Sequence, residues 1–231
     1  MQKDIFKIEG IPAILWGDHS DKIYLYVHGK CGCKEEAEGF ANIACDKGWQ
    51  VLSIDLPEHG ERKQEQNGFY PWIVVPQLQS IMAYIKQRWQ TVRLMASSIG
   101  AWFSMQAYEA ETFEKCLFVS PILDMKHLIE NMMRWAAVSE AELKEKQEIK
   151  TSFGETLSCR YLTYAKDHPI KHWNSPIAIL YADKDHLTER SIVDDFCRTY
   201  NVQLQVMKDG EHWFHTPEQV EVLNCWIKEQ A

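Results

Sequence analysis

The chain alternates between short apolar runs and longer segments in which apolar residues recur every three or four positions. The run KIYLYVHG (22–29) is almost continuously apolar, which is typical of a strand covered on both faces. The segment that follows it has one apolar face between residues 37 and 44, which predicts a helix that ends at Gly48. This alternation predicts a mostly parallel sheet with helices on both faces.

The same pattern predicts the remaining elements. DIFKIEGIPAILWG (4–17) is predicted to form an antiparallel hairpin that turns at Glu9 and Gly10. Further strands are predicted at 22–29, 49–55, 92–96, 115–123, 175–185 and 201–212. Helices are predicted at 37–48, from Pro76 to Trp89, at 99–110, around 192–196 and from Thr216 onward. The last of these helices is expected to bury Val220, Leu223, Trp226 and Ile227.

One segment breaks the alternation. Residues 122–174 contain no convincing strand, and their first part carries a helical apolar stripe of Leu128, Met132, Trp135 and Ala136. We therefore expect a single domain over 1–231 with a helical lid insertion at about 122–174.

Composition and charge narrow the class of protein. The chain has 231 residues and a net charge of −8, with its basic residues scattered, so neither nucleic acid nor a membrane surface is an expected partner. It has no run resembling a signal peptide and an odd number of cysteines, seven, which predicts reduced thiols in a cytoplasmic protein. Cys31 and Cys33 form a C-x-C without a second ligand pair, so no metal is expected.

The segment VRLMASSIGAWFS (92–104) predicts a strand that turns sharply into a helix. A nucleophile at such an elbow needs small residues two positions before and after it. Centring the elbow on Ser98 places Ala96 and Gly100 there, whereas centring it on Ser97 places two bulky residues there. Ser98 is therefore the predicted nucleophile.

Acyl transfer also needs two N–H donors for the oxygen that becomes negative. One should come from Ile99, which follows the nucleophile. The loop VHGKCG (27–32) ends a strand and contains Gly29, so Lys30 is the predicted second donor, with Cys31 as the alternative. His28 is expected to hold this loop through its ring, and the Lys30 ammonium either is solvated or meets an anionic substrate.

A serine hydroxyl needs a histidine base and an acid that orients it. His212 follows the last predicted strand and is favoured over His215, which precedes a helix start. Asp185 ends the preceding strand and is favoured over Asp183, with Asp124 as a further alternative. The histidines at 59, 127, 168, 172 and 186 are expected to be surface or capping residues.

Over nearly its whole length the chain resembles the α/β-hydrolase superfamily, in particular its small lid-bearing serine esterases and serine-aminopeptidase-like members. The matching pieces are YVHGK, VLSIDLPEHGER, ASSIGA, LYADKDHL and DGEHWF. Arg62 replaces the usual serine of the second piece, and Ala96 the first glycine of the elbow. The resemblance implies the α/β-hydrolase fold, with Ser98 as nucleophile, Asp185 as acid and His212 as base.

The expected activity is hydrolysis of a carboxylic ester of a small molecule through a covalent acyl-enzyme, with no cofactor. Three alternatives stay open: an amide or peptide hydrolase, cofactor-free chemistry such as perhydrolysis or carbon–carbon cleavage, and a non-catalytic binding module. The pocket is expected between Ser98 and the insertion. Side chains expected to line it and favour an apolar acyl or alcohol group are Trp102, Met132, Met133, Trp135 and Tyr161.

Overall fold

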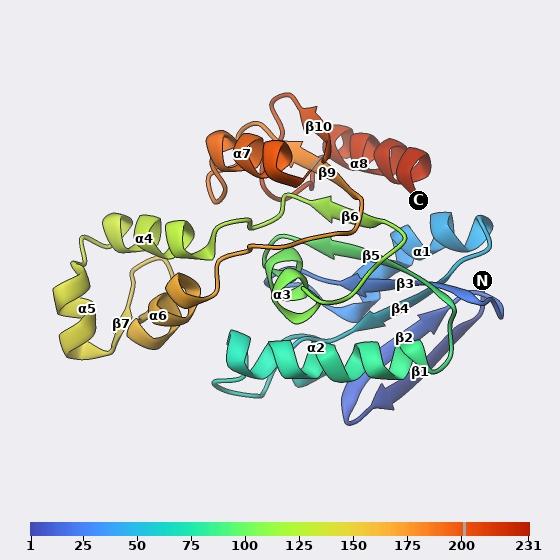
Figure 1. The fold of residues 1–231 in the computed structure, drawn as a ribbon, viewed down its shortest axis with the longest axis horizontal. Coiled ribbons are helices and arrows are strands. Elements are labelled where there is room, and N and C mark those ends of the chain that lie inside the picture. Colours follow the sequence, from blue (N-terminus) through green and yellow to red (C-terminus); the bar gives the residue numbers. More distant parts are fainter. Residues whose placement is uncertain (201) are drawn as a thin grey trace.

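The computed structural model describes residues 1–200 and 202–231, and in these residues eight strands form one twisted sheet (Figure 1). Their order across the sheet is β1-β2-β4-β3-β5-β6-β9-β10. The strands are β1 (Lys3–Ile8), β2 (Ile11–Trp16), β3 (Lys22–Val27), β4 (Gln50–Ile54), β5 (Thr91–Ser97), β6 (Cys116–Val119), β9 (Ile177–Ala182) and β10 (Gln203–Met207). Asn201, the first residue of the predicted 201–212 strand, lies outside the described residues.

The predicted N-terminal hairpin is confirmed: β1 pairs antiparallel with β2, and Ile8 lies opposite Ile11. Glu9 and Gly10 both have positive φ (50° and 87°), the conformation that two-residue hairpin turns favour. β2 then pairs antiparallel with β4, whereas the pairs from β4 through β3, β5, β6 and β9 to β10 are parallel. The carboxyl ends of β3, β5, β6 and β9 therefore meet at one edge.

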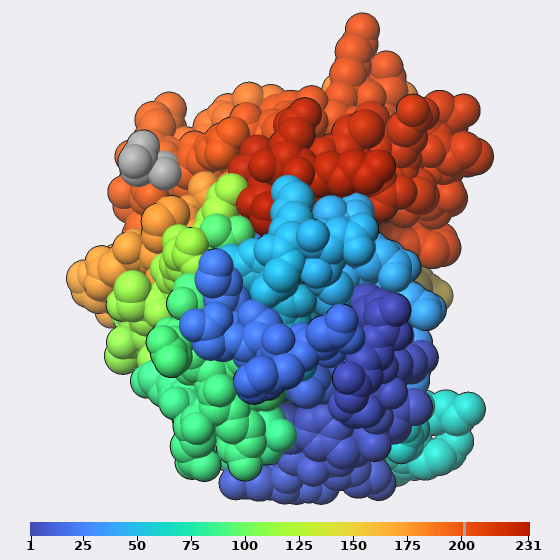
Figure 2. All heavy atoms as spheres, turned by 90° about the vertical axis from the view of Figure 1, so that its right-hand side faces the viewer, coloured from blue at the N-terminus to red at the C-terminus, as the bar shows by residue number. Residues whose placement is uncertain are grey.

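Helices cover both faces of this sheet. α2 (Pro71–Lys86), α3 (Ile99–Ala107) and α7 (Arg190–Tyr200) bury side chains in the cluster on one face. α1 (Ala37–Asp46) and α8 (Pro217–Gln230) bury theirs in the cluster on the other. Figure 2 shows α1 and α8 side by side at the end of the molecule where the N-terminal hairpin lies. The predicted mostly parallel sheet with helices on both faces is thus confirmed.

The segment between β6 and β9 lies at the opposite end of the molecule from the two termini (Figure 1). It contains α4 (Met125–Trp135), α5 (Glu140–Lys146), β7 (Glu148–Lys150), β8 (Thr156–Ser158) and α6 (Cys159–Asp167). The prediction that it has no strand was wrong, because β7 and β8 pair antiparallel through a turn in which Gly154 has φ +87°. Two three-residue strands with few apolar positions give almost no alternating pattern to detect.

Two helix details also differ from the prediction. α2 begins at Pro71 and not at Pro76, which lies inside the helix, where it removes one backbone hydrogen bond. In α8, Val220 is 38% exposed, because the buried face is the one that carries Trp226 and Ile227. No helix in residues 1–200 and 202–231 is long and apolar enough to cross a bilayer.

Candidate active site

Ser98 stands between the end of β5 and the first residue of α3, with φ 51° and ψ −124°. This conformation is strained for any residue other than glycine, and such strain concentrates at functional sites. A side chain at Gly100 would bring its Cβ within 2.3 Å of the His28 carbonyl oxygen. The end of β3 thus requires glycine two positions after Ser98, and the first turn of α3 packs directly on the adjacent strand.

Ser98, His212 and Asp185 form one hydrogen-bonded chain. Ser98 Oγ lies 2.8 Å from His212 Nε2, and His212 Nδ1 lies 2.7 Å from Asp185 Oδ2. A carboxylate only accepts, so Nδ1 carries the proton and Nε2 is free to accept the serine hydroxyl. The Asp185 side chain is fully buried, and its other oxygen accepts from the N–H groups of Leu187 (2.8 Å) and Thr188 (3.2 Å).

The alternative acids lie elsewhere. Asp124 is the N-cap of α4 and accepts from the His127 N–H at 2.9 Å. Asp183 is exposed, and its N–H donates to the carbonyl of Met207 at 3.1 Å in the turn that follows β9. The carboxylate that contacts His212 is that of Asp185.

The alternative base and the alternative nucleophile are also apart from this chain of bonds. The His215 ring stacks on Trp213, and its Nδ1 contacts the Trp213 carbonyl at 2.8 Å. Ser97 is the last residue of β5, and the next residue, Ser98, makes the hydrogen bond to the imidazole.

Ile99 and Lys30, the two predicted N–H donors, line the same cavity as Ser98. The Gly29 carbonyl accepts from His28 Nδ1 (2.7 Å) and from the Gly32 N–H (3.2 Å). The N–H and C=O of a trans peptide point in opposite directions, so these two bonds fix the direction of the Lys30 N–H. The Cys31 N–H donates to the ring of His59 at 2.9 Å and is therefore committed elsewhere.

Gly29 allows the loop to come this close to the nucleophile. A Cβ at Gly29 would lie 3.1 Å from the Cβ of Ser98 and 3.3 Å from the Ser97 carbonyl oxygen. A larger residue would therefore push the loop away from Ser98 and displace the Lys30 N–H.

Two buried histidines hold this loop by the same arrangement, in which Nδ1 contacts a backbone carbonyl and Nε2 accepts from a backbone N–H. His28 donates from Nδ1 to Gly29, and its Nε2 accepts from the Leu56 N–H at 3.0 Å. His59 faces the Pro57 carbonyl with Nδ1 at 2.7 Å and accepts at Nε2. Burial is the main cause that lowers the pKa of His28 to about 4, so its ring is neutral. His59 was expected to be a surface or capping residue. It is the N-cap residue of the short 3-10 helix Gly60–Arg62, but its ring is buried and makes no capping hydrogen bond, because it contacts the Gly29 loop instead.

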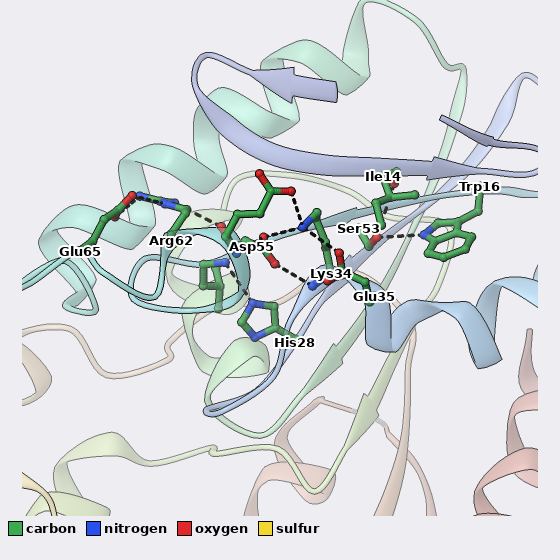
Figure 3. Close-up of polar contacts among 11 residues, drawn as sticks. Ile14, Trp16, His28, Lys34, Glu35, Ser53, Asp55, Arg62 and Glu65 are labelled. Atoms are coloured by element: carbon green, nitrogen blue, oxygen red, sulfur yellow. Dashed lines mark hydrogen bonds and ion pairs between the residues drawn. The ribbon is translucent and has the colours of Figure 1, made fainter. Parts of the chain in front are cut away.

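A buried ion pair anchors the loop after β4 (Figure 3). The Asp55 carboxylate accepts from Lys34 Nζ (2.9 Å), the Lys34 N–H (2.8 Å) and the Glu61 N–H (3.0 Å). Burial is the largest single influence on both pKa values, and it disfavours the charged form of each group. Together the hydrogen bonds outweigh it: they lower the pKa of Asp55, and, with those that the Lys34 ammonium donates to Glu35 and Glu61, they raise the pKa of Lys34. At Gly60, a Cβ would lie 2.1 Å from the Asp55 carboxylate.

Arg62, which follows this anchor in the same loop, connects it to α2. Its guanidinium donates to the Asp55 carbonyl at 3.2 Å and to the Glu65 carboxylate at 2.8 Å (Figure 3). It also donates to Gln77 of α2 at 2.8 Å. The arginine thus holds the 55–65 loop against the helix.

Ser98 opens into a cavity of about 1060 Å³ between the insertion and the 58–70 segment. Met132, Trp135 and Tyr161 line it, as the sequence predicted. Trp102 does not: it is 2% exposed and packs behind the Tyr161 ring, with 6.0 Å between ring centroids. The expectation for Trp102 was wrong because its side chain on α3 faces α6. Met133 is likewise buried in the core and outside the lining.

Most charged groups in the cavity wall are already paired. The Lys30 ammonium donates to the Glu155 carboxylate in the β7–β8 turn, which links the Gly29 loop to the insertion. Glu58 accepts from the N–H groups of Gly68 (2.7 Å) and Phe69 (3.2 Å). Within the described residues, no group of three or more His, Cys, Asp or Glu side chains is arranged to hold a metal.

The strand order, the strained serine at the β5–α3 turn and the helices on both faces define an α/β-hydrolase fold. Over 98% of this chain and 96% of the other, it is similar to Est1E from Butyrivibrio proteoclasticus with bound ferulic acid (TM-score 0.74, 16% identity). It is also similar to mouse alpha/beta hydrolase domain-containing protein 10 (TM-score 0.75, 13% identity, covering 99% and 98%) and to a monoacylglycerol lipase from Paleococcus ferrophilus (TM-score 0.67, 16% identity, covering 96% and 99%). No protein-family model and no curated protein sequence matches the chain.

Proposed function

We propose that this protein is a serine hydrolase that cleaves a carboxylic ester, with Ser98 as nucleophile, His212 as base and Asp185 as the acid that orients it. The observation that carries this proposal is the hydrogen-bonded chain from Asp185 through His212 to Ser98, which lines a large cavity. Each of the three residues follows a different strand: Ser98 follows β5, Asp185 follows β9 and His212 follows β10.

In the first half-reaction Ser98 Oγ forms a bond to the ester carbonyl carbon while its proton passes to His212 Nε2. The carbonyl electrons move to the oxygen, which accepts hydrogen bonds from the N–H groups of Lys30 and Ile99. The intermediate then collapses and breaks the bond to the alkoxy oxygen, which leaves as an alcohol with the proton from His212. A water molecule repeats these steps on the acyl-enzyme and releases the acid.

The charges around the cavity favour an ester over a peptide. A peptide with a free terminus needs an unpaired charge near the scissile bond. The charged lining residues Lys30, Glu155 and Glu58 have partners, and the remaining one, Lys63, is exposed to solvent. The names of the similar structures, which include a monoacylglycerol lipase, point the same way. We propose in addition that the insertion, residues 122–174, is the lid over this site.

Hydrolysis of p-nitrophenyl butyrate by the intact chain tests the proposal. Ser98→Ala should lower kcat/KM by about 10³-fold or more, because the nucleophile is lost. Ser97→Ala is the matched control, since it removes the neighbouring hydroxyl and should retain activity. Equal rates for the Ser98 and Ser97 variants, or no turnover by the wild type on any ester, would show that the assignment is wrong.

A further inference from the structure

An apolar stripe on α4 faces the cavity. Met125, Leu128, Ile129, Met132 and Trp135 all line it, at the three- and four-residue spacing that puts side chains on one face of a helix. The opposite face of α4 carries Lys126 and Glu130, which pair with each other. The helix therefore turns a continuous hydrocarbon surface toward Ser98 and its cavity.

This stripe begins beside the nucleophile. The N–H of Ile122 donates to the Ser98 carbonyl at 3.1 Å, and α4 starts three residues later at Met125. From there α4 runs away from the carboxyl end of β6 toward the far end of the molecule (Figure 1). The apolar surface thus leads outward from the reacting atoms.

Exposure increases along the same direction. Met125 and Ile129 are each 3% exposed, whereas Trp135 at the far end is 50% exposed. The Trp135 ring meets Phe153 of the β7–β8 turn at 6.1 Å between centroids, and Phe153 is 42% exposed. The two aromatic rings mark the solvent end of the surface.

The length of the apolar surface on α4 limits the length of the alkyl chain that can lie along it. Ten residue steps from Met125 to Trp135 span roughly 15 Å along the helix. An extended chain advances about 1.2 Å per bond, since three backbone bonds cover about 3.6 Å, so this surface matches about twelve carbon atoms. Leu157 and Tyr161 add further apolar surface to the cavity wall.

We propose that the substrate is an ester carrying an unbranched alkyl chain of about twelve carbons, which lies along α4 between Ser98 and Trp135. This inference rests on the proposed function for the identity of the scissile bond. A neutral hydrocarbon chain fits because the α4 side of the cavity has no charged residue among the described lining residues.

Two ester series test the chain and its position. One is p-nitrophenyl acyl esters from two to sixteen carbons, and the other is acetate esters of linear alcohols over the same range, all below their micelle concentrations. In one of the two series kcat/KM should rise up to about fourfold per methylene and level off near twelve carbons. The series that shows the rise identifies the chain as acyl or alcohol. A flat profile in both series overturns the proposal.

Variants locate the chain on α4. Met132→Trp places a bulky ring about 10 Å along the surface and should abolish the gain beyond about eight carbons. Trp135→Ala, at an exposed position that does not endanger folding, should reduce the gain only for the longest chains. Lys126→Trp, on the solvent face of the same helix, is the matched control and should leave the length profile unchanged. A profile altered as much by Lys126→Trp as by Met132→Trp would contradict the assignment.

Calorimetric titration of dodecan-1-ol separates this proposal from the proposed function. Wild type should bind the alcohol at least tenfold more tightly than Met132→Trp does, whether or not any ester is hydrolysed. Binding without hydrolysis would leave the alkyl site standing and refute the esterase. Hydrolysis of short esters with a flat profile and no such difference in binding would refute the alkyl site and leave the esterase standing.

Discussion

Lowering the pH from 7.5 to 5.0 should remove about 2 kcal/mol of folding free energy through His28 alone. The ring is fully buried, donates from Nδ1 to the Gly29 carbonyl and accepts at Nε2 from the Leu56 N–H. A proton added at Nε2 would turn this acceptor into a donor that faces another donor. Together with burial, this opposes protonation in the folded protein.

The sign and size follow from the two pKa values. The pKa of His28 is about 4 in the folded protein, against an ordinary histidine pKa of 6.5 in the unfolded chain. Above pH 6.5 neither state binds the proton, so the stabilising contribution is complete. Below pH 6.5 the unfolded chain binds a proton that the folded chain does not, and stability falls until about pH 4. At pH 5.0, about 1.5 pH units below the pKa of the unfolded chain, the free energy of unfolding has fallen by about 2 kcal/mol, at 1.36 kcal/mol per pH unit.

Urea unfolding at pH 7.5, 6.5, 5.5 and 5.0 measures this contribution in wild type and in His28→Gln. Glutamine retains an acceptor for Leu56 but does not titrate. The difference in unfolding free energy between the two proteins should therefore shrink by about 2 kcal/mol over this range. Comparing the two proteins cancels the other histidines, and carboxylates such as Asp55 with a lowered pKa affect stability mainly at lower pH. A difference that stays constant with pH would show that burial of neutral His28 does not contribute to the pH dependence of stability.

Three further predictions concern the loops around the site. Gly60→Ala should lower the free energy of unfolding in urea by about 3 kcal/mol or more, because Gly60 has φ +53° and its Cβ would overlap the buried Asp55 carboxylate. Gly39→Ala, on the open face of α1, should instead raise it by about 0.5–1 kcal/mol. Similar effects of the two substitutions would contradict the packing at Gly60. A double-mutant cycle with Lys30→Gln and Glu155→Gln, followed by urea unfolding, should give a coupling of up to about 1 kcal/mol that disappears in 1 M salt. Zero coupling at low salt would show that the ion pair is not formed. Asp185→Asn should lower kcat for ester hydrolysis by about 10⁴-fold with little change in KM, because the amide favours the wrong tautomer of the His212 imidazole. Near-wild-type turnover would show that Asp185 is not the acid of the proposed triad.

Much of the fold and of the site's arrangement was predictable because both depend on local signals. A buried parallel strand is continuously apolar, and a nucleophile elbow demands small residues at fixed positions. The sequence therefore placed Ser98, Asp185 and His212 at the ends of three strands, and the structure brings these side chains within hydrogen-bond distance of one another.

The rest depends on contacts between distant segments, which no local pattern carries. His59 braces the loop that contains Cys31, and Glu155 pairs with Lys30 across 125 positions. Trp102 has the size and polarity of a pocket residue, but the packing of α3 against α6 turns it into the core. Such roles are fixed by tertiary packing and appear only in the folded chain.

The proposed activity requires that Ser98 is the nucleophile and that His212 activates it. The most direct test is to treat the intact protein with a fluorophosphonate probe and to map the adduct by peptide mass spectrometry. We expect one adduct, on Ser98, that is lost in Ser98→Ala, strongly reduced in His212→Ala and retained in Ser97→Ala. An unlabelled Ser98 in folded protein, or labelling that survives loss of the histidine unchanged, would contradict this assignment.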